Sequence, residues 1–287
     1  MPKKKQKQSQ VIEIPKPILY IAKFLQAISS SLTIKFAAKL FTTPIRHKLP
    51  KRELHMERES VQKSIMVPAI NKEVVVYEYG KSDKKVLLVH GWSGRGTQLV
   101  KIADELLKLG YMTISFDAPA HGKSKGNYSI MTEFIASILE LEKQYGSFEY
   151  AIGHSLGGMS VLNAIKQNLQ VKKAVTIGAG DIIQDIIDDF IKKLQLKPEY
   201  GIKLKDHFEK RFVGKMDDYS AYKAAAEIKI PVLIMHDKED DDVSVKAAYH
   251  IHEHLQGSEL VITEGLGHRK ILGDDEVIKK IKEFISK

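Results

Sequence analysis

A serine lies between two glycines in the stretch GHSLG, residues 153–157. A short apolar run, FEYAIG, leads into it, and residues with helical spacing, MSVLNAIKQN, follow. Such a serine would occupy a tight turn between strand and helix, where side chains at Gly153 and Gly157 would collide with neighbouring backbone. The turn projects the hydroxyl beyond the sheet edge, so Ser155 is a candidate nucleophile. It then needs a base to take its proton and an acid to orient that base.

His268 is the candidate base. It lies in TEGLGHRKIL, directly after the last predicted strand, where a loop would return it to the same edge of the sheet. His90, His121 and His236 also follow predicted strands. His90 and His121 precede Ser155, whereas a G-x-S-x-G turn is followed along the chain by its acid and then its base.

The orienting acid is expected in the loop after the predicted strand PVLIMHD. This loop offers Asp237, Glu239, Asp240, Asp241 and Asp242. Asp237 is still attached to the strand end, whereas Asp240 has the turn length to reach across, and Val243 after it can anchor the chain again. We therefore expect Asp240 to be the third catalytic residue and its neighbours to be solvated loop charges.

Negative charge that develops on an attacked carbonyl needs backbone N–H donors at this edge. The glycine-rich stretch HGWSGRG, residues 90–96, follows a strongly apolar strand and lets the backbone approach a ligand. Leu156 follows the nucleophile at the start of a helix. The N–H groups of Trp92 and Leu156 are the predicted oxyanion hole.

Strands and helices alternate along the chain and would position these residues. Apolar, β-branched runs predict strands at 73–80, 84–91, 111–118, 148–153, 172–179, 230–237 and 258–265. Helical spacing predicts helices at 98–110, 129–146, 159–168 and 275–287. The alternation indicates an α/β fold, with a mostly parallel sheet and helices on both faces.

Residues 181–229 depart from this alternation, because they have helical spacing and no convincing strand. A compact domain rarely spends that length on a structureless loop, so we expect an inserted helical cap over one end of the sheet. Its aromatic residues would line an acyl site or hold the cap together: Phe190, Tyr200, Phe208, Phe212, Tyr219 and Tyr222. The substrate-binding residues are not identified by the sequence.

With these pieces in order, residues 67–287 resemble the α/β-hydrolase family, in its branch with a helical cap. The matching segments are LLVHGWSGRG, SFDAPAHGKSKG, AIGHSLGG, PVLIMHDKEDDDV and LGHRKIL. The chain departs from the family at HDKED, where relatives commonly carry glycine after the histidine. The resemblance implies an eight-stranded sheet, no cofactor, and an acyl-enzyme mechanism on an ester, thioester or amide.

The positive charge of the chain is concentrated near its N-terminus. The 287 residues carry a net charge of +9, but residues 1–55 hold twelve Lys and Arg against two acidic residues. The remaining 33 basic and 34 acidic residues nearly balance. We therefore expect a basic N-terminal extension over 1–55, a hydrolase domain over 56–287, and no nucleic-acid partner. The chain has no cysteine, which fits a reducing, cytoplasmic compartment.

The extension begins with MPKKKQKQSQ, which has too little apolar content to fold. One or two amphipathic helices are expected after it, with an apolar stripe at Ile18, Ile21, Leu25, Ile28 and Leu32. Its longest uncharged run, 24–34, is far shorter than the ~20 residues of a membrane span. Two interpretations remain: the stripe packs on the body, or it rests weakly on the anionic inner face of a membrane.

The sequence thus predicts a serine hydrolase, most simply a carboxylesterase that cleaves a small-molecule ester or thioester. The alternative is a catalytically silent binding protein of the same fold, at a membrane surface. A third hypothesis is a metal site at YHIHEHL, where His250 and His254 share a helical face. Two histidines without a third ligand are more typical of a solvated helix, so we expect no metal and no cofactor.

Overall fold

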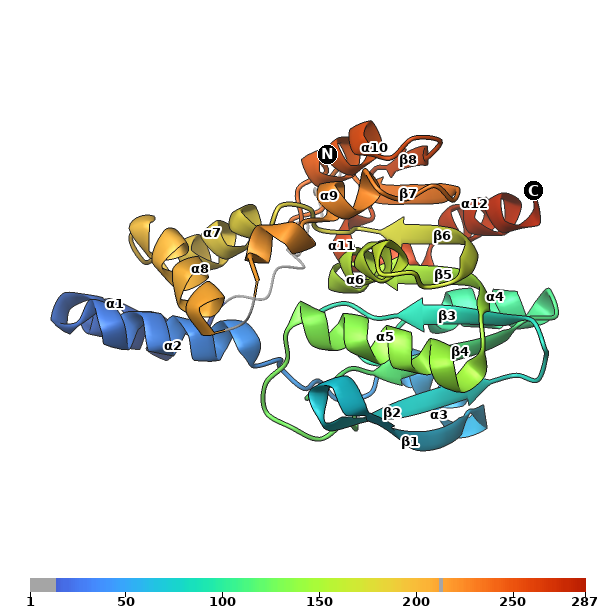
Figure 1. Cartoon of the computed structure of the whole chain (residues 1–287), viewed down its shortest axis with the longest axis horizontal. Coiled ribbons are helices and arrows are strands. Elements are labelled where there is room, and N and C mark those ends of the chain that lie inside the picture. Colours follow the sequence, from blue (N-terminus) through green and yellow to red (C-terminus); the bar gives the residue numbers. More distant parts are fainter. Residues whose placement is uncertain (1–13, 212–213) are drawn as a thin grey trace, which may run out of the picture.

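The computed structural model describes residues 14–211 and 214–287. The predictions made for residues 1–10 and for Phe212 therefore lie outside the described residues. The described residues form an eight-stranded sheet in the order β1-β2-β4-β3-β5-β6-β7-β8 (Figure 1). Its strands are β1 (Val61–Val67), β2 (Lys72–Tyr79), β3 (Lys85–Val89), β4 (Met112–Asp117), β5 (Phe148–His154), β6 (Val171–Ile177), β7 (Val232–Asp237) and β8 (Glu259–Thr263). Pairing is antiparallel from β1 through β2 to β4 and parallel from β4 to β8. The predicted mostly parallel sheet is confirmed.

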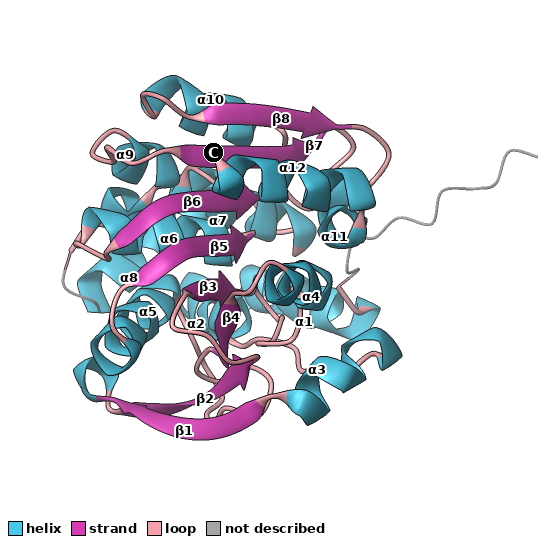
Figure 2. Cartoon of the chain, turned by 90° about the vertical axis from the view of Figure 1, so that its right-hand side faces the viewer, coloured by secondary structure: helices cyan, strands magenta, loops and turns pink. Residues whose placement is uncertain are grey.

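Helices cover both faces of this twisted sheet (Figure 2). One face packs against α3 (Leu54–Glu59), α4 (Val100–Lys108) and α12 (Asp275–Ser286). The other packs against α5 (Met131–Tyr145), α6 (Leu156–Lys166), α9 (Ala221–Ala225) and α10 (Lys246–His254). Both layers bury aliphatic side chains. The carboxyl ends of the parallel strands are therefore held at one edge between two packed layers.

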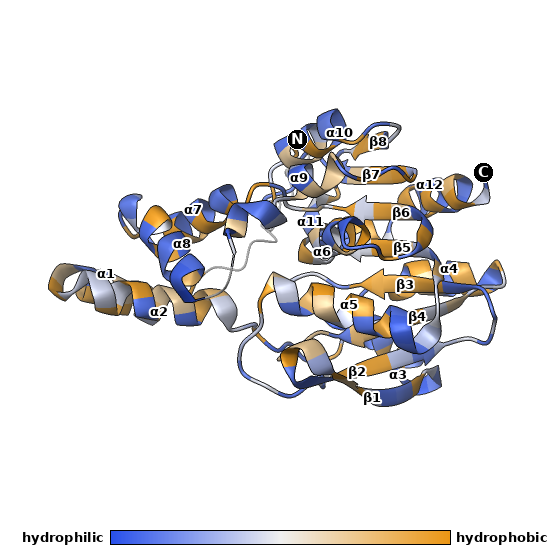
Figure 3. Cartoon of the chain, viewed as in Figure 1, coloured by the Kyte–Doolittle hydropathy of each residue, from blue (hydrophilic) through white to orange (hydrophobic). Residues whose placement is uncertain are grey.

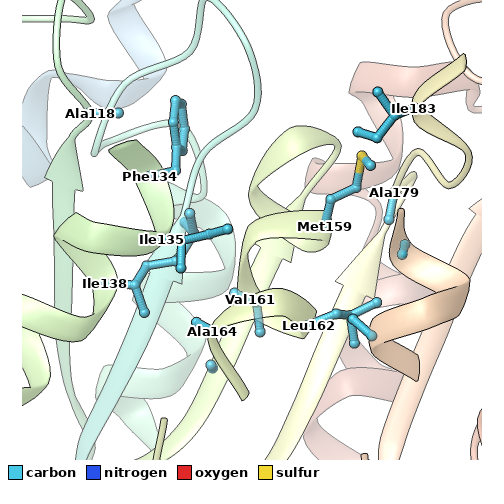
Figure 4. Packing of buried hydrophobic residues seen from close by; sticks show 14 of the residues in the cluster. Ala118, Phe134, Ile135, Ile138, Met159, Val161, Leu162, Ala164, Ala179 and Ile183 are labelled. Atoms are coloured by element: carbon cyan, nitrogen blue, oxygen red, sulfur yellow. The ribbon is translucent and has the colours of Figure 1, made fainter. Parts of the chain in front are cut away.

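The core between sheet and helices continues into the residues that support the serine turn. Figure 4 shows Phe134, Ile135 and Ile138 of α5 beside the apolar side chains of α6. Met159 of α6 lies near Ala179 and Ile183, where the body meets the helical insertion. These side chains are buried. The packing fixes α6, and with it the turn that precedes the helix.

Helix α11 (Gly267–Lys270), where a loop was expected, strand β1 and helix α3 were not predicted from the sequence. Strand β1 is an edge strand whose side chains are mostly exposed, so it lacks the apolar run by which the other strands were predicted. Helix α3 has only six residues, of which Met56 is buried. Short or exposed elements carry little periodic signal.

The interval 181–229 folds into helices, as expected. Its described residues form α7 (Ile183–Lys193), α8 (Glu199–Arg211) and α9, with a 3-10 turn at Met216–Tyr219. The two ends of the insertion are clamped together: Ala221 donates its backbone N–H to the Asp181 carbonyl at 3.0 Å. The Ile183 N–H is donated to the Ser220 hydroxyl oxygen at 3.2 Å. Helices α7 and α8 therefore leave and re-enter the body at one point, and α9 belongs to the layer that packs on the sheet.

The N-terminal extension forms α1 (Lys16–Ile28) and α2 (Ser30–Thr42), which lie against the insertion (Figure 1). The Phe41 ring of α2 lies 5.1 Å from Phe190 of α7 and 5.7 Å from Phe208 of α8, centroid to centroid. Lys197, between α7 and α8, donates its N–H to the Gln26 side chain of α1 at 2.8 Å. The extension thus packs on the cap helices.

The apolar stripe predicted for this segment is divided between two faces, with Ile18 packed against the core. Ile21, Ile28 and Leu32 are exposed, whereas Ala22 and Ala37 are buried. The buried positions of the two helices thus include small alanine side chains, which contribute little to an apolar pattern. Among the described residues, no helix has both the length and the apolar character required to cross a membrane.

A chain of hydrogen bonds ties the extension to the sheet edge. The Arg46 guanidinium donates to the carbonyl oxygens of Ala120 at 3.0 Å, Ser124 at 2.6 Å and Gly126 at 3.2 Å. The Ile45 N–H is donated to the Ser93 hydroxyl oxygen at 2.9 Å. Residues 43–52 therefore pass directly over the loops that follow β3 and β4.

Candidate active site

The serine turn has the strained geometry that its glycines suggested. Ser155 lies between β5 and α6 with a φ of 53°, a left-handed conformation that non-glycine residues rarely adopt. A Cβ at Gly153 would lie 2.4 Å from the Gly157 carbonyl oxygen, and one at Gly157 would lie 2.4 Å from the Val89 oxygen. Both contacts are with backbone, which cannot move aside. Glycine is required at both positions to hold Ser155 in this turn.

His268 and Asp240 are brought together at the same edge. His268 lies in the short helix α11 (Gly267–Lys270) after β8, and its Nδ1 donates to Asp240 Oδ2 at 2.6 Å. Both side chains are buried, with 8% and 1% of their surface exposed. The proton on Nδ1 leaves Nε2 as the lone-pair nitrogen of the neutral ring, the form a general base needs.

His154, which precedes the nucleophile, contacts the base directly. Its Nε2 donates to the His268 carbonyl oxygen at 2.9 Å, and the two ring centroids are 4.6 Å apart. This contact fixes the backbone of His268 beside the serine turn. His154 stands at a variable position of the G-x-S-x-G motif and was not among the predicted site residues.

Asp240 accepts hydrogen bonds from backbone groups as well as from His268. Its Oδ1 accepts the backbone N–H groups of Asp242 at 2.9 Å and Val243 at 2.8 Å. His236 places Nε2 3.4 Å from Oδ2. Burial alone would raise the pKa of Asp240, but the hydrogen bonds from His236, His268 and the backbone outweigh it and hold the pKa well below its ordinary value. Asp240 is therefore a carboxylate at neutral pH.

The neighbouring acid Asp237 has a different role. Its carboxylate accepts the Glu239 N–H at 3.0 Å, the Thr263 hydroxyl at 2.7 Å and the Leu266 N–H at 3.1 Å. These hydrogen bonds join the ends of β7 and β8. They give the Asp237 carboxylate a structural role. Of the five acids in this loop, Asp240 is the one that accepts a hydrogen bond from His268.

The predicted oxyanion loop lies against the serine turn. A Cβ at Gly91 would come within 2.9 Å of the Ser155 Cβ, so this loop can approach only as glycine. His90 fixes the loop: its Nδ1 donates to the Gly91 carbonyl at 2.7 Å, and its Nε2 accepts the Ala118 N–H at 3.0 Å. Leu156 is the first residue of α6, where backbone N–H groups have no intrahelical partner.

Three buried histidines at this edge must remain neutral. Burial lowers the pKa of His90 well below its ordinary value, that of His121 to about 4 and that of His154 to about 3. The unfolded chain takes up protons at these rings below pH ~6.5, whereas the folded chain does not. Stability is therefore complete above that pH and falls as the pH drops toward the folded-state values.

We expect the free energy of unfolding to fall between pH 6.5 and 4 by about 1.4 kcal/mol per pH unit for each such histidine. Urea unfolding at a series of pH values measures this slope. His121→Asn should flatten it, because asparagine takes up no proton in this range. The amide can still donate to the Pro119 carbonyl that His121 Nδ1 contacts, which preserves the fold. His254→Asn, at an exposed position, is the control. Equal slopes in wild type and His121→Asn would contradict the assignment.

A cavity of about 1340 Å³ opens at this edge and includes Ser155, Leu156, Trp92 and Asp240 in its lining. Most of its remaining wall is apolar, contributed by α2, α5 and the insertion: Leu40, Phe41, Ile135, Leu139, Ile183, Ile186, Phe190, Phe208, Met216 and Tyr219. Of the aromatic residues named in the insertion, Phe190, Phe208 and Tyr219 line the cavity, whereas Tyr200 is buried in the core. The helices α2 and α7 thus help to enclose the site.

The histidines of YHIHEHL have other partners. His250 Nδ1 is paired with the buried carboxylate of Asp181, and His254 Nδ1 donates to the His250 carbonyl at 2.8 Å. The Tyr222 ring packs on both imidazoles. No group of three metal-ligating side chains occurs within residues 14–211 and 214–287. Asp181 and His250 instead line the cavity, a contribution that the sequence did not indicate.

Comparison with known proteins identifies the architecture. Residues 84–210 match the family model of the alpha/beta hydrolase fold. An esterase from Pyrococcus furiosus, 21% identical, aligns with a TM-score of 0.66 over 85% of this chain and 97% of its own. The chain has the alpha/beta hydrolase fold. This agrees with the resemblance noted in its motifs.

Other solved structures of the alpha/beta hydrolase fold are similarly close. The esterase EaEST from Exiguobacterium antarcticum is 20% identical, with a TM-score of 0.62 over 79% of this chain and all of its own. A membrane phospholipase A is 16% identical, with a TM-score of 0.61 over 93% of this chain and 92% of its own. No curated protein sequence matches the chain significantly. At these identities, the structural likeness establishes the fold.

Proposed function

We propose that this protein is a serine hydrolase that cleaves a carboxylic ester or thioester through an acyl-enzyme at Ser155. The observation that carries the proposal is the buried hydrogen bond between His268 and Asp240, at the edge where the strained Ser155 lines an apolar cavity. Two of the similar structures are named esterases and the third a phospholipase, all of which cleave esters.

The proposed reaction has two halves. Ser155 Oγ attacks the substrate carbonyl carbon while His268 Nε2 takes the hydroxyl proton, and the N–H groups of Trp92 and Leu156 stabilise the oxyanion. When the intermediate collapses, the bond to the leaving group breaks and His268 returns the proton to it. Water then attacks the acyl-enzyme by the same steps and releases the acid. Asp240 stays ionised and stabilises the imidazolium.

The cavity favours a substrate with an acyl chain of medium length. Its volume of about 1340 Å³ exceeds the ~300–1,000 Å³ typical of small-ligand pockets, and its wall is largely aliphatic and aromatic. Burial of each methylene contributes about 0.8 kcal/mol. We therefore expect kcat/KM on p-nitrophenyl esters to rise from acetate to medium-chain acids.

We expect Ile186→Trp to shorten the chain length that the enzyme accepts. Ile186 lies on α7, lines the cavity and is near Gly180, so a larger side chain there would occupy space for the acyl chain. The ratio of kcat/KM for octanoate over acetate should fall about tenfold or more. Ile202→Trp, on the exposed side of α8, is the matched control. An unchanged ratio in Ile186→Trp would show that the chain binds elsewhere.

The alternative is a silent binding protein of the same fold, and covalent labelling separates the two. A fluorophosphonate reacts only with a serine activated by a base. The proposal expects a label on Ser155, located by mass spectrometry, and no label in His268→Ala. An unlabelled Ser155 in the folded wild-type protein would favour the binding protein.

A further inference from the structure

Helix α1 presents large apolar side chains to solvent. Tyr20, Phe24 and Ile28 have 70%, 64% and 60% of their surface exposed, and Ile21 has 47%. At about 100° per residue, these four positions fall within an arc of about 100° on one face of the helix. We call them the α1 patch. Exposed clusters of this kind mark interaction sites rather than ordinary surface.

The opposite face of α1 already has its partner. Ala22 is fully buried, Ile18 packs against the core, and the Gln26 side chain accepts the Lys197 N–H. The helix is therefore held on the insertion by one face, while its second apolar face points away from the molecule. In Figure 3, α1 carries hydrophobic segments although it lies at the edge of the molecule.

The surroundings of the α1 patch are basic. Residues 14–52 contain eight Lys and Arg and no acidic residue. Lys16 and Lys23 are exposed on α1, and α2 exposes Leu32 together with Lys35 and Lys39. An apolar strip flanked by lysines is complementary to a lipid interface with anionic headgroups.

The charge also argues against a second copy of this chain as the occupant. Packing two α1 patches together would bring the lysines of both copies close to each other, with no acidic residue in 14–52 to pair with them. Nor can the helix insert across a bilayer. Thirteen residues span about 20 Å, less than the ~30 Å hydrocarbon core. A helix of this length must lie in the plane of the interface.

We propose that α1 and α2 dock this protein flat on an anionic lipid bilayer. The α1 patch enters the headgroup region, and Lys16, Lys23, Lys35 and Lys39 contact lipid phosphates. The end of α2 also lines the cavity, through Leu40 and Phe41, so docking places the site beside the bilayer. The docking itself does not rest on the proposed function, because it involves none of the catalytic residues.

Vesicle sedimentation with the full-length protein tests the proposal. Wild type should sediment with vesicles of phosphatidylcholine and phosphatidylglycerol, bind pure phosphatidylcholine about tenfold less, and be partly released by salt. A variant with Tyr20→Ser, Phe24→Ser and Ile28→Ser should lose binding about tenfold or more. The matched control carries Leu109→Ser, Ile202→Ser and Tyr249→Ser, which are exposed apolar residues elsewhere, and should bind as wild type does.

A fluorescence probe reports whether the α1 patch itself enters the interface. The chain has a single tryptophan, Trp92, so Phe24→Trp adds one signal to a known background. Its emission should shift to shorter wavelength on anionic vesicles, while the Trp92 emission of wild type stays unchanged. Circular dichroism establishes that each variant is folded.

Three results would overturn the proposal. One is equal vesicle binding by wild type and the α1 patch variant, and another is no vesicle binding by folded wild type. The third is a wild-type dimer in sedimentation velocity that the α1 patch variant dissociates, without vesicle binding, which would assign the patch to a second copy. Esterase activity is not a readout, so these outcomes are distinct from failure of the proposed function.

Discussion

Ser155→Ala is expected to lower kcat on a p-nitrophenyl ester by about 10⁶-fold, and His268→Ala by a similar factor. The two residues act as one unit: without the hydroxyl there is no nucleophile, and without the imidazole nothing removes its proton. The double variant should therefore lose no more than either single variant. Initial rates, with the thermal unfolding midpoint of each variant, provide the measurement.

Ser244→Ala is the matched control for this experiment. Ser244 also lines the cavity but belongs to the loop before α10 and not to the strained turn between β5 and α6. It should keep near wild-type kcat. Residual activity in Ser155→Ala within tenfold of wild type would end the serine mechanism, because a hydroxyl that is dispensable is not the nucleophile.

Asp240→Asn is expected to lower kcat by about 10⁴-fold while the protein stays folded. The Asn carbonyl can replace Oδ1 and still accept the N–H groups of Asp242 and Val243. Its amide would then face His268 Nδ1, which donates to the carboxylate in the native protein. To avoid a donor–donor contact, His268 must move its proton to Nε2, where it can no longer accept the serine proton.

Asp241→Asn tests whether the choice among the loop acids is right. Asp241 is exposed and adjacent in sequence, so the substitution removes the same charge from the same loop without touching His268. It should change kcat less than about threefold. A large loss in Asp241→Asn together with a small one in Asp240→Asn would reverse the assignment. The pH dependence of kcat, measured for each variant, distinguishes loss of the His268 orientation from loss of a negative charge near His268.

Much of this fold was accessible from the sequence because buried parallel strands read as continuous apolar runs. Strands β3 to β7 follow such runs, and the glycines around Ser155 indicated a close backbone contact that no larger residue permits. Asp240 could be selected by turn length alone. Its hydrogen bond to His268 is a tertiary contact between segments 28 residues apart, which only the structure can display.

In the N-terminal extension, the sequence predicts the helices but not which of their faces is buried. Helical periodicity finds apolar residues on a helix but does not say which of two apolar faces is covered. In α1 the covered face depends on Ala22 and the exposed one on Phe24, the opposite of what side-chain size would suggest. The partners that decide the matter, α7 and α8, lie far along the chain. Their contribution to the cavity wall was one of two roles expected for the aromatic residues of the insertion, and Phe190 and Phe208 do line the cavity.

The hydrogen bond between Lys197 and Gln26 joins residues 171 positions apart, which has a consequence for synthesis of the protein. At ~5–20 residues per second, a ribosome makes Lys197 roughly 10–30 s after Gln26. During that interval α7 and α8 are not complete, so both faces of α1 are exposed to solvent. The segment is then open to chaperones, to aggregation and to a nearby bilayer, so contact with lipid can precede completion of the cavity that α2 helps to enclose.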